Sequence, residues 1–122
     1  YYGLVSFMDD NVGQVLDALE ESGQAGNTRI IYTSDHGEML GGNGLWGKMC
    51  MYEDSAAIPH IMAGPDLPEG AVVDANISWV DIFPTVLDCV GVPLAESDAD
   101  LPGTSLWPIA RGESNPPTRS PW

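Results

Sequence analysis

The chain has 122 residues, of which 43% are apolar and 8% aromatic. This is enough apolar material for a folded core and too much for a disordered segment. Asp and Glu number 18 against 4 Lys and Arg, which gives a net charge of −14. Because non-specific nucleic-acid binding depends on Lys and Arg that neutralise phosphates, this balance argues against a nucleic-acid partner. No apolar run reaches the roughly 18 residues that a membrane span needs.

Both ends of the chain suggest a piece of a longer protein. The sequence starts at Tyr1 without an initiator Met, inside a helical pattern, and stops at Trp122 in a proline-rich stretch. No signal peptide is visible, and a chain that lacks its N-terminus cannot show one, so the compartment stays open. Cys50 and Cys89 have neither metal-binding nor CxxC spacing, which favours two free buried thiols.

Residues 1–22 are predicted to form an amphipathic helix, because apolar residues recur at steps of three and four. Those apolar residues are Leu4, Val5, Met8, Val12, Val15, Leu16 and Leu19. Gly23 and Gly26 follow, where a helix end favours glycine. Residues 29–33 are β-formers without polar alternation, a pattern typical of a buried parallel strand. A helix, a short loop and a buried strand together indicate an α/β fold.

Two more strands and a second helix are predicted in the next part of the chain. Short apolar runs at residues 58–63 and 72–77 are the candidate strands. Residues 78–81 have the Ser-x-x-acid form of a capping box, so a helix is expected to begin there. Pro84 should kink this helix or restart it, and Gly91 should end it.

The remaining segments are predicted to be mostly loops. Residues 41–48 are too rich in glycine for a helix interior or a strand. Residues 94–102 are acidic and loop-like, and residues 105–112 are predicted to add one short helix. The tail from Glu113 is expected to be unstructured.

Asp35, His36 and Gly37 directly follow the first predicted strand. Ligands of open α/β sheets bind just outside the carboxyl ends of the strands. A carboxylate oxygen beside an imidazole nitrogen is a common pair for a divalent metal, and Gly37 allows a sharp backbone turn behind it. The competing interpretation is a capping aspartate beside a solvated loop histidine, and so short a motif does not separate the two.

Lys48 is the only lysine, and it follows the glycine-rich stretch. A lone cation behind such a loop and near a metal site suits the clamping of an oxyanion. The alternative is an ordinary exposed lysine, since most lysines are solvated. His60 is interpreted as a partly buried strand residue, and the adjacent Glu53 and Asp54 cannot share a helical face as an acid/base pair. No nucleophile elbow of the Gly-x-Ser-x-Gly type is present.

Five stretches of the chain resemble, in order, motifs of the sulfatase family. They are residues 1–13, 30–41, 44–59, 80–88 and 103–106. The second stretch, which holds Asp35 and His36, resembles a metal-binding motif of that family. Its Asp-His form is most similar to the choline-sulfatase and phosphonate-monoester-hydrolase branch.

The resemblance implies an α/β fold, as part of an alkaline-phosphatase-like α/β sandwich with a mostly parallel sheet flanked by helices. Residues 1–93 would be the C-terminal portion of the catalytic domain, and residues 94–122 a linker and the start of a smaller C-terminal subdomain. Asp35 and His36 would bind one divalent cation, Ca²⁺ in the first place, with Mn²⁺ or Mg²⁺ as alternatives. Lys48 would contact the sulfate oxygens, a substrate-binding and catalytic role.

The implied reaction is hydrolysis of a small-molecule or carbohydrate sulfate ester by a formylglycine hydrate. Formylglycine is made from Cys or Ser in a Cys/Ser-x-Pro-x-Arg motif, which this chain lacks, as it lacks the family's first aspartate pair. Both are expected in the missing N-terminal half of the same domain, so the chain alone is expected to be inactive. Asn43 stands where relatives often have His or Arg, and Ala57 stands where they often have Arg. These two differences leave the details of substrate recognition open.

Two alternatives to a sulfatase remain from the sequence. A phosphonate or phosphodiester hydrolase of the same superfamily would share the metal and lysine features, and only the nucleophile would separate the two. A non-catalytic α/β interaction module is the alternative of a different class, but it would need neither the Asp35-His36 pair nor Lys48.

Overall fold

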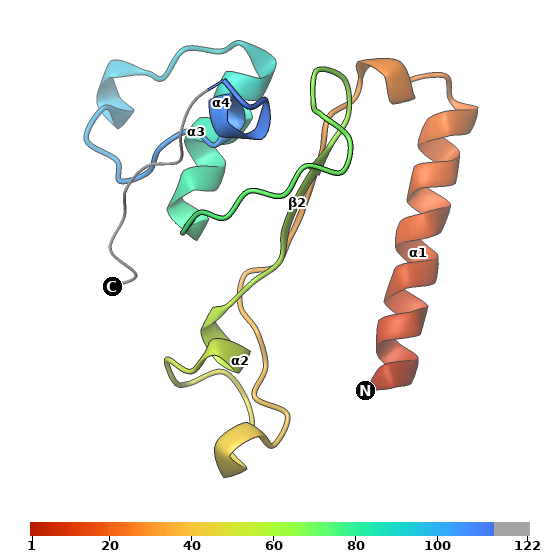
Figure 1. Cartoon of the computed structure of the whole chain (residues 1–122), viewed down its shortest axis with the longest axis vertical. Coiled ribbons are helices and arrows are strands. Elements are labelled where there is room, and N and C mark those ends of the chain that lie inside the picture. The colour runs from red at the N-terminus through yellow and green to blue at the C-terminus, as the bar shows by residue number, and fades with distance from the viewer. Residues whose placement is uncertain (114–122) are drawn as a thin grey trace.

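The computed structural model describes residues 1–113. Its helices and strands are α1 (Tyr2–Glu21), β1 (Ile30–Thr33), α2 (Glu53–Ala56), β2 (His60–Ala63), α3 (Ile82–Val90) and α4 (Trp107–Ala110). The two strands run through the centre of the molecule (Figure 1). The helices α3 and α4 lie at one end of this ladder, and α2 with the glycine-rich loop lies at the other.

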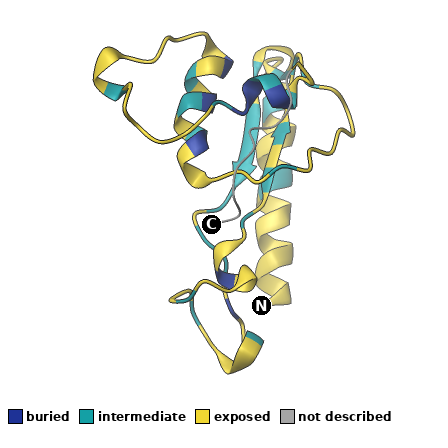
Figure 2. Cartoon of the chain, turned by 60° about the vertical axis from the view of Figure 1, so that its left-hand side comes forward, coloured by how far each residue is buried: buried dark blue, intermediate teal, exposed yellow. Residues whose placement is uncertain are grey.

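The first predicted helix is confirmed as α1, and it lies beside the strand pair without burying any of its own residues. It ends just before Gly23, whose φ of 71° is in the left-handed region that glycine tolerates best. Most apolar positions of the helix are exposed, whereas Val12 and Leu19 are half-buried (Figure 2). The Tyr32 hydroxyl reaches Met8 Sδ at 3.7 Å, so within residues 1–113 the apolar face of α1 is only partly covered.

The first two predicted strands are confirmed. The prediction that residues 29–33 form a parallel strand is wrong, because this strand pairs with β2 in the antiparallel direction. β1 and β2 are antiparallel, with Ile30 opposite Ala63 and Thr33 opposite His60. Parallel neighbours need a crossover that returns the chain to the starting edge. Here the connection turns back at the end where β1 stops, so β2 returns in the opposite direction.

The third predicted strand, residues 72–77, does not form. These residues form no helix or strand, and the one sheet of the described chain contains β1 and β2 alone. The side chain of Val72 is 93% exposed. β-forming residues make a strand only when a neighbouring strand accepts their backbone hydrogen bonds, and this segment has no such neighbour among residues 1–113.

The predicted capping box is present at the start of the second long helical segment. The Ser78 backbone N–H donates to the Asp81 carboxylate at 2.8 Å. A 3-10 turn, η3 (Trp79–Asp81), precedes α3, so the helix restarts before Pro84 rather than at it. Pro84 then lies in the first turn of α3, where its missing N–H costs no hydrogen bond. The helix ends at Gly91, as predicted.

The main core of the molecule lies where α3 and α4 meet. Asp81 and Thr85 are completely buried. The Thr85 hydroxyl donates to the Asp81 carbonyl at 2.6 Å and accepts from the Leu106 N–H at 2.8 Å. The Trp107 ring is buried beneath the Arg29 guanidinium, which lies 4.9 Å from the ring centroid. Polar bonds and one cation–π contact thus fix α4 against α3 and the start of β1.

The last described segment is a loop followed by a short helix, as predicted. A 3-10 turn, η4 (Glu96–Asp98), interrupts the loop, and α4 is the short helix expected within residues 105–112. Residues 114–122 of the predicted tail lie outside the described residues. The domain boundary after residue 93 stays a prediction. No helix in residues 1–113 has the length and apolar content to cross a bilayer.

Candidate active site

The predicted metal-binding residues lie immediately after β1, in the turn that leads toward the glycine-rich loop. The Asp35 side chain is 72% exposed and that of His36 is 37% exposed. The Asp35 carboxylate accepts a hydrogen bond from the His36 backbone N–H at 3.0 Å, and the Ser34 hydroxyl donates to the His36 carbonyl at 2.8 Å. These short-range bonds hold both side chains at the end of the strand, within reach of a ligand.

The orientation of the His36 ring follows from its second nitrogen. Nδ1 lies 2.8 Å from the Gly37 carbonyl oxygen. Because a carbonyl can only accept, Nδ1 carries the proton, and the lone pair of Nε2 is available in the neutral ring. Nε2 points toward the Asp35 carboxylate, 3.4 Å from Oδ2. The two donor atoms of the predicted metal pair therefore lie close together.

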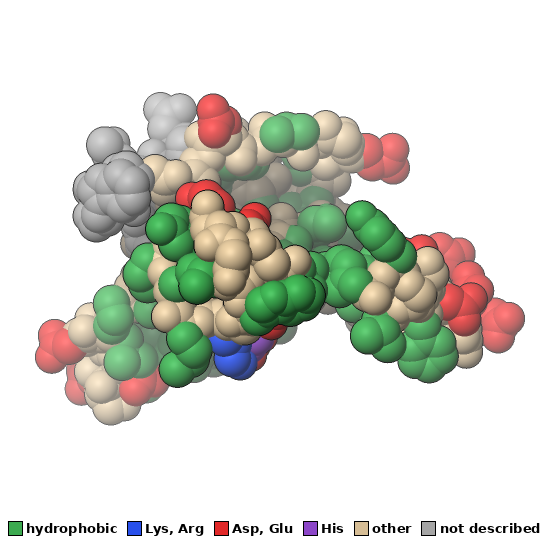
Figure 3. Space-filling model, turned by 90° about the horizontal axis from the view of Figure 1, so that it is seen from below, with side chains coloured by type: hydrophobic (Ala, Val, Ile, Leu, Met, Phe, Trp, Pro, Cys, Tyr) green, Lys and Arg blue, Asp and Glu red, His purple; other side chains and the backbone are tan. Residues whose placement is uncertain are grey.

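Lys48 joins this pair from the far side of the glycine-rich loop. Its Nζ is in direct contact with His36 Nε2. By contrast, the cations of Arg29 and Arg111 pair with Asp66 and Glu113 at 2.7 and 2.8 Å. Seen from this end of the molecule, a basic side chain and a histidine meet at one point bordered by apolar groups (Figure 3). The structure thus brings together all three residues that the sequence singled out.

The loop that carries Lys48 is closed by backbone bonds rather than left open. The N–H of Met39 donates to the Gly47 carbonyl at 2.9 Å, and that of Gly41 donates to Leu45 at 2.8 Å. The Gly47 N–H donates to the Glu38 carboxylate at 2.6 Å. Met39 is only 2% exposed and anchors the loop from inside. Lys48 therefore leaves a defined turn whose two ends are tied together.

A short helix that the sequence did not predict, α2, completes this end of the molecule. Its Ser55 is 3% exposed and donates through Oγ to the Lys48 carbonyl at 2.8 Å. The Ser55 carbonyl accepts from the Gly37 N–H, also at 2.8 Å. Glu38 and Ser55 are the polar residues of this region that sequence reasoning did not single out. Acidic residues in the first turn of α2 were the available signal for the helix, but nothing local marks a serine as buried.

The Asp35-His36 pair fits part of a metal site. Two ligands bound to one cation at about 2.0–2.5 Å, and about a right angle apart, are separated by roughly 3–3.5 Å. The 3.4 Å between Oδ2 and Nε2 has this spacing. No group of three or more His, Cys, Asp or Glu side chains within residues 1–113 could hold a metal ion. The pair would therefore supply adjacent positions on an ion whose other ligands come from elsewhere.

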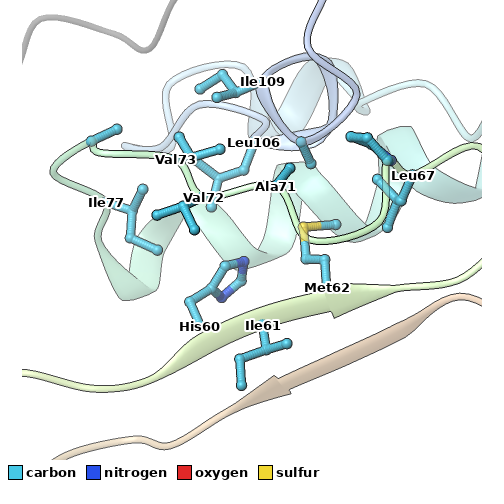
Figure 4. A pocket seen from close by; sticks show the side chains of 13 residues that line it. His60, Ile61, Met62, Leu67, Ala71, Val72, Val73, Ile77, Leu106 and Ile109 are labelled. Carbon is cyan, nitrogen blue, oxygen red and sulfur yellow. The ribbon is translucent and has the colours of Figure 1, made fainter.

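A cavity lies away from these residues. It has a volume of about 360 Å³ and lies between β2 and α4, lined by apolar side chains and His60 (Figure 4). His60 opens β2, as expected of a partly buried strand residue. Both of its ring nitrogens are buried and have no hydrogen-bond partner among residues 1–113. Burial lowers the pKa of its imidazole, and the nearby Asp81 opposes that shift. Asp35, His36 and Lys48 do not line this cavity.

The prediction that both cysteines are free is confirmed for this chain. Neither Cys50 nor Cys89 forms a disulfide, and Cys89 is buried while Cys50 is half-buried. Burial raises the pKa of the Cys89 thiol, an effect that the Arg29 guanidinium opposes. A thiol shifted in this direction is a poor nucleophile at neutral pH.

Comparison with known proteins identifies the family of this chain. The family model described as Sulfatase matches residues 1–92. The chain belongs to the sulfatase family. The predicted resemblance to the sulfatase family is thereby confirmed.

Individual sulfatase relatives agree with the family assignment. The choline-sulfatase of Rhizobium meliloti (strain 1021) is 38% identical over 112 residues, which are 92% of this chain and 22% of the relative. The phosphonate monoester hydrolase SpPMH from Silicibacter pomeroyi matches with a TM-score of 0.80 and 38% identity, over 93% of this chain and 21% of that one. BT4656, solved with its substrate D-glucosamine-2-N,6-O-disulfate, matches with a TM-score of 0.83 and 38% identity, over 93% and 22%.

These comparisons also show how much of a sulfatase the chain covers. It spans about a fifth of the length of the relatives that it matches. The α/β fold of the sulfatases is therefore present as one segment, with a two-stranded piece of sheet and the helices around it.

Proposed function

We propose that this sulfatase segment supplies two metal ligands and a sulfate-binding cation to an active site that hydrolyses sulfate esters. One observation carries the proposal: Asp35 Oδ2, His36 Nε2 and Lys48 Nζ converge at the end of β1. A sulfate ester is an anion that gains charge on its sulfuryl oxygens and its leaving oxygen as the ester bond breaks. Cationic groups placed beforehand around those oxygens lower the energy of that transition state.

Each of the three side chains has a separate role. A divalent cation held by Asp35 and His36 would act as a Lewis acid and a template for the sulfate group. The Gly37 carbonyl keeps the His36 ring oriented through Nδ1, so that Nε2 remains a ligand. Lys48, whose Nζ lies against that nitrogen, would place its ammonium beside the bound anion. No nucleophile is assigned within these 122 residues.

Ca²⁺ is the metal that we propose first, with Mn²⁺ or Mg²⁺ as alternatives. An exposed carboxylate in a loop suits a cation with flexible geometry and many oxygen ligands. The proposed substrate is a small-molecule or carbohydrate sulfate ester. Two relatives support this class, since one is a choline-sulfatase and another is solved with a disulfated glucosamine as its substrate.

A second candidate function is phosphonate or phosphodiester hydrolysis. The likeness to a phosphonate monoester hydrolase favours it, at the same identity as the choline-sulfatase. A phosphoryl group is also a tetrahedral anion, so the same metal pair and lysine could bind it. The segment described here offers no feature that distinguishes the two anions.

The test uses the complete polypeptide encoded by the gene. We expect it to hydrolyse 4-nitrophenyl sulfate with a higher kcat/KM than 4-nitrophenyl phenylphosphonate. Lys48→Ala should lower kcat/KM for the sulfate ester by about 100- to 1000-fold, the loss typical of one oxyanion-stabilising group. Arg111→Ala is the matched control, because this cation is paired with Glu113 and packs on Trp107.

The outcomes separate the two candidate functions. Faster turnover of the phosphonate would replace the proposed function with the second candidate. Turnover of neither substrate, or equal losses in Lys48→Ala and Arg111→Ala, would contradict a catalytic role for this site.

A further inference from the structure

Ser55 connects the two halves of the candidate active site. Its hydroxyl donates to the carbonyl of Lys48 at 2.8 Å. Its carbonyl accepts from the N–H of Gly37, the residue after the metal-binding pair, also at 2.8 Å. One residue of α2 is thus bonded to both the lysine segment and the metal-ligand segment, in addition to the bonds that Gly47 makes with Glu38 and Met39.

The burial of Ser55 makes this connection rigid. Only 3% of its surface is exposed, and its own N–H donates to the Tyr52 carbonyl at 2.9 Å. The backbone of α2 lies so close to Gly37 that a Cβ there would collide with the carbonyl oxygen of Asp54. Loss of the Ser55 hydroxyl would deprive the Lys48 carbonyl of this part-buried hydrogen bond, and loss of the second contact would deprive the Gly37 N–H of this acceptor.

We propose that Ser55 is a positioning residue, which holds the backbone of Lys48 so that the ammonium reaches the Asp35-His36 pair. The inference rests on the proposed function, because it concerns the site that this function uses. A lysine side chain is long and flexible, so the position of its ammonium group is defined only if the backbone of the lysine is held in place. The hydroxyl of Ser55 provides a side-chain bond that fixes the Lys48 backbone.

The test compares Ser55→Ala with Ser105→Ala in the complete polypeptide. Ser105 is half-buried, and its hydroxyl donates to Asp88 at 2.6 Å, at the α3–α4 end of the molecule. Ser55→Ala loses one side-chain hydrogen bond, and Ser105→Ala loses its bond to Asp88 together with the one that its hydroxyl accepts from the Trp107 N–H at 3.2 Å. Ser55→Ala should lower kcat/KM for 4-nitrophenyl sulfate by about 10- to 100-fold, as expected of a small misplacement of a catalytic group. Ser105→Ala should leave kcat/KM unchanged.

A double-mutant cycle separates positioning from a merely structural role. If Ser55 acts through Lys48, Ser55→Ala should change kcat/KM by less than about twofold when Lys48 is already alanine. A full additional loss in the Lys48→Ala background would overturn the proposal. Equal effects of Ser55→Ala and Ser105→Ala in the wild-type background would overturn it as well.

Two further measurements keep the result interpretable. Should Ser55→Ala fail to fold, Ser55→Cys takes its place, because a thiol keeps a weaker donor at the same position. It should show a smaller loss in kcat/KM, again absent in the Lys48→Ala background. If the wild-type protein hydrolyses no sulfate ester, the proposed function itself fails. If it does hydrolyse the ester and the Ser55 variants keep full activity, only the positioning role fails.

Discussion

Asp35 is the residue through which the proposed metal can be tested most directly. Its carboxylate is 72% exposed and faces His36 Nε2. Asp35→Asn keeps the shape of the side chain and removes its negative charge, so we expect Ca²⁺ affinity to fall by about 100-fold. Replacing a residue that only contacts a metal ligand lowers metal affinity by about 10- to 100-fold, so the loss of a ligand's charge should reach the upper end of that range. Calorimetric titration of the metal-free complete polypeptide measures this change.

The control for Asp35 is an exposed carboxylate on α1. Asp17→Asn removes the same charge far from the site and should leave Ca²⁺ affinity unaltered. Chelation should abolish activity of the wild-type protein, and added Ca²⁺ should restore it. Unchanged Ca²⁺ affinity in Asp35→Asn would mean that Asp35 is not a metal ligand.

His60 predicts how stability depends on pH. Burial lowers the pKa of its ring below the usual 6.5 in the folded protein. Below pH 6.5 the unfolded chain therefore takes up a proton that the folded chain does not. The free energy of unfolding should fall as pH drops from about 6.5 toward the lower pKa of the folded state. Denaturant unfolding at pH 7.5 and pH 5.5 measures this loss.

His60→Leu provides the comparison for that experiment. Leucine suits the apolar lining around this position (Figure 4) and cannot be protonated. The variant should lose less stability than the wild type between pH 7.5 and pH 5.5. The same loss in both proteins would assign the pH dependence to other groups.

At the scale of elements, Asp81 decides how α3 is joined to the chain after it. It is fully buried, and its carboxylate accepts from the backbone N–H groups of Ser78 and Thr104, each at 2.8 Å. Asp81→Ala would leave two N–H groups without this acceptor. We expect a loss of about 2–4 kcal/mol in the free energy of unfolding. Denaturant titration beside Asp74→Ala, an exposed loop aspartate, measures it. Comparable losses would indicate that the cap is dispensable.

At the scale of the whole molecule, the apolar face of α1 governs behaviour in solution. Leu4 and Val15 are 71% and 67% exposed, and no residue of the helix is buried. Exposed apolar surface of this extent promotes association, even in a chain with a net charge of −14. The isolated 122-residue chain should therefore self-associate, as measured by light scattering.

Charged substitutions test which surface causes that association. Leu4→Glu combined with Val15→Glu should raise the monomer fraction of the isolated chain. Val72→Glu places a charge on an apolar residue that is 93% exposed outside α1, and it should have little effect. Equal effects of the two changes would assign the association to overall charge rather than to the helix face.

The sequence by itself determined the features that depend on near neighbours along the chain. The apolar period of α1, the capping box at Ser78 and the glycine that ends α3 are all local patterns, and each is present in the structure. The Asp-His motif and the lone lysine were also recognisable as candidate site residues, because family motifs can be identified from the identity and order of residues along the chain. The structure places these side chains side by side at the end of β1, and their roles as metal ligands and sulfate-binding cation stay predictions.

Only the tertiary structure decided what depends on residues far apart in the sequence. The antiparallel pairing of β1 with β2 and the failure of residues 72–77 to form a strand depend on which segments become neighbours. Ser55 carries no local signal, because its burial and its bonds to Gly37 and Lys48 arise only when α2 packs against the turn after β1. Backbone hydrogen bonds need a partner in space, and a partner in space is not a property of a local pattern.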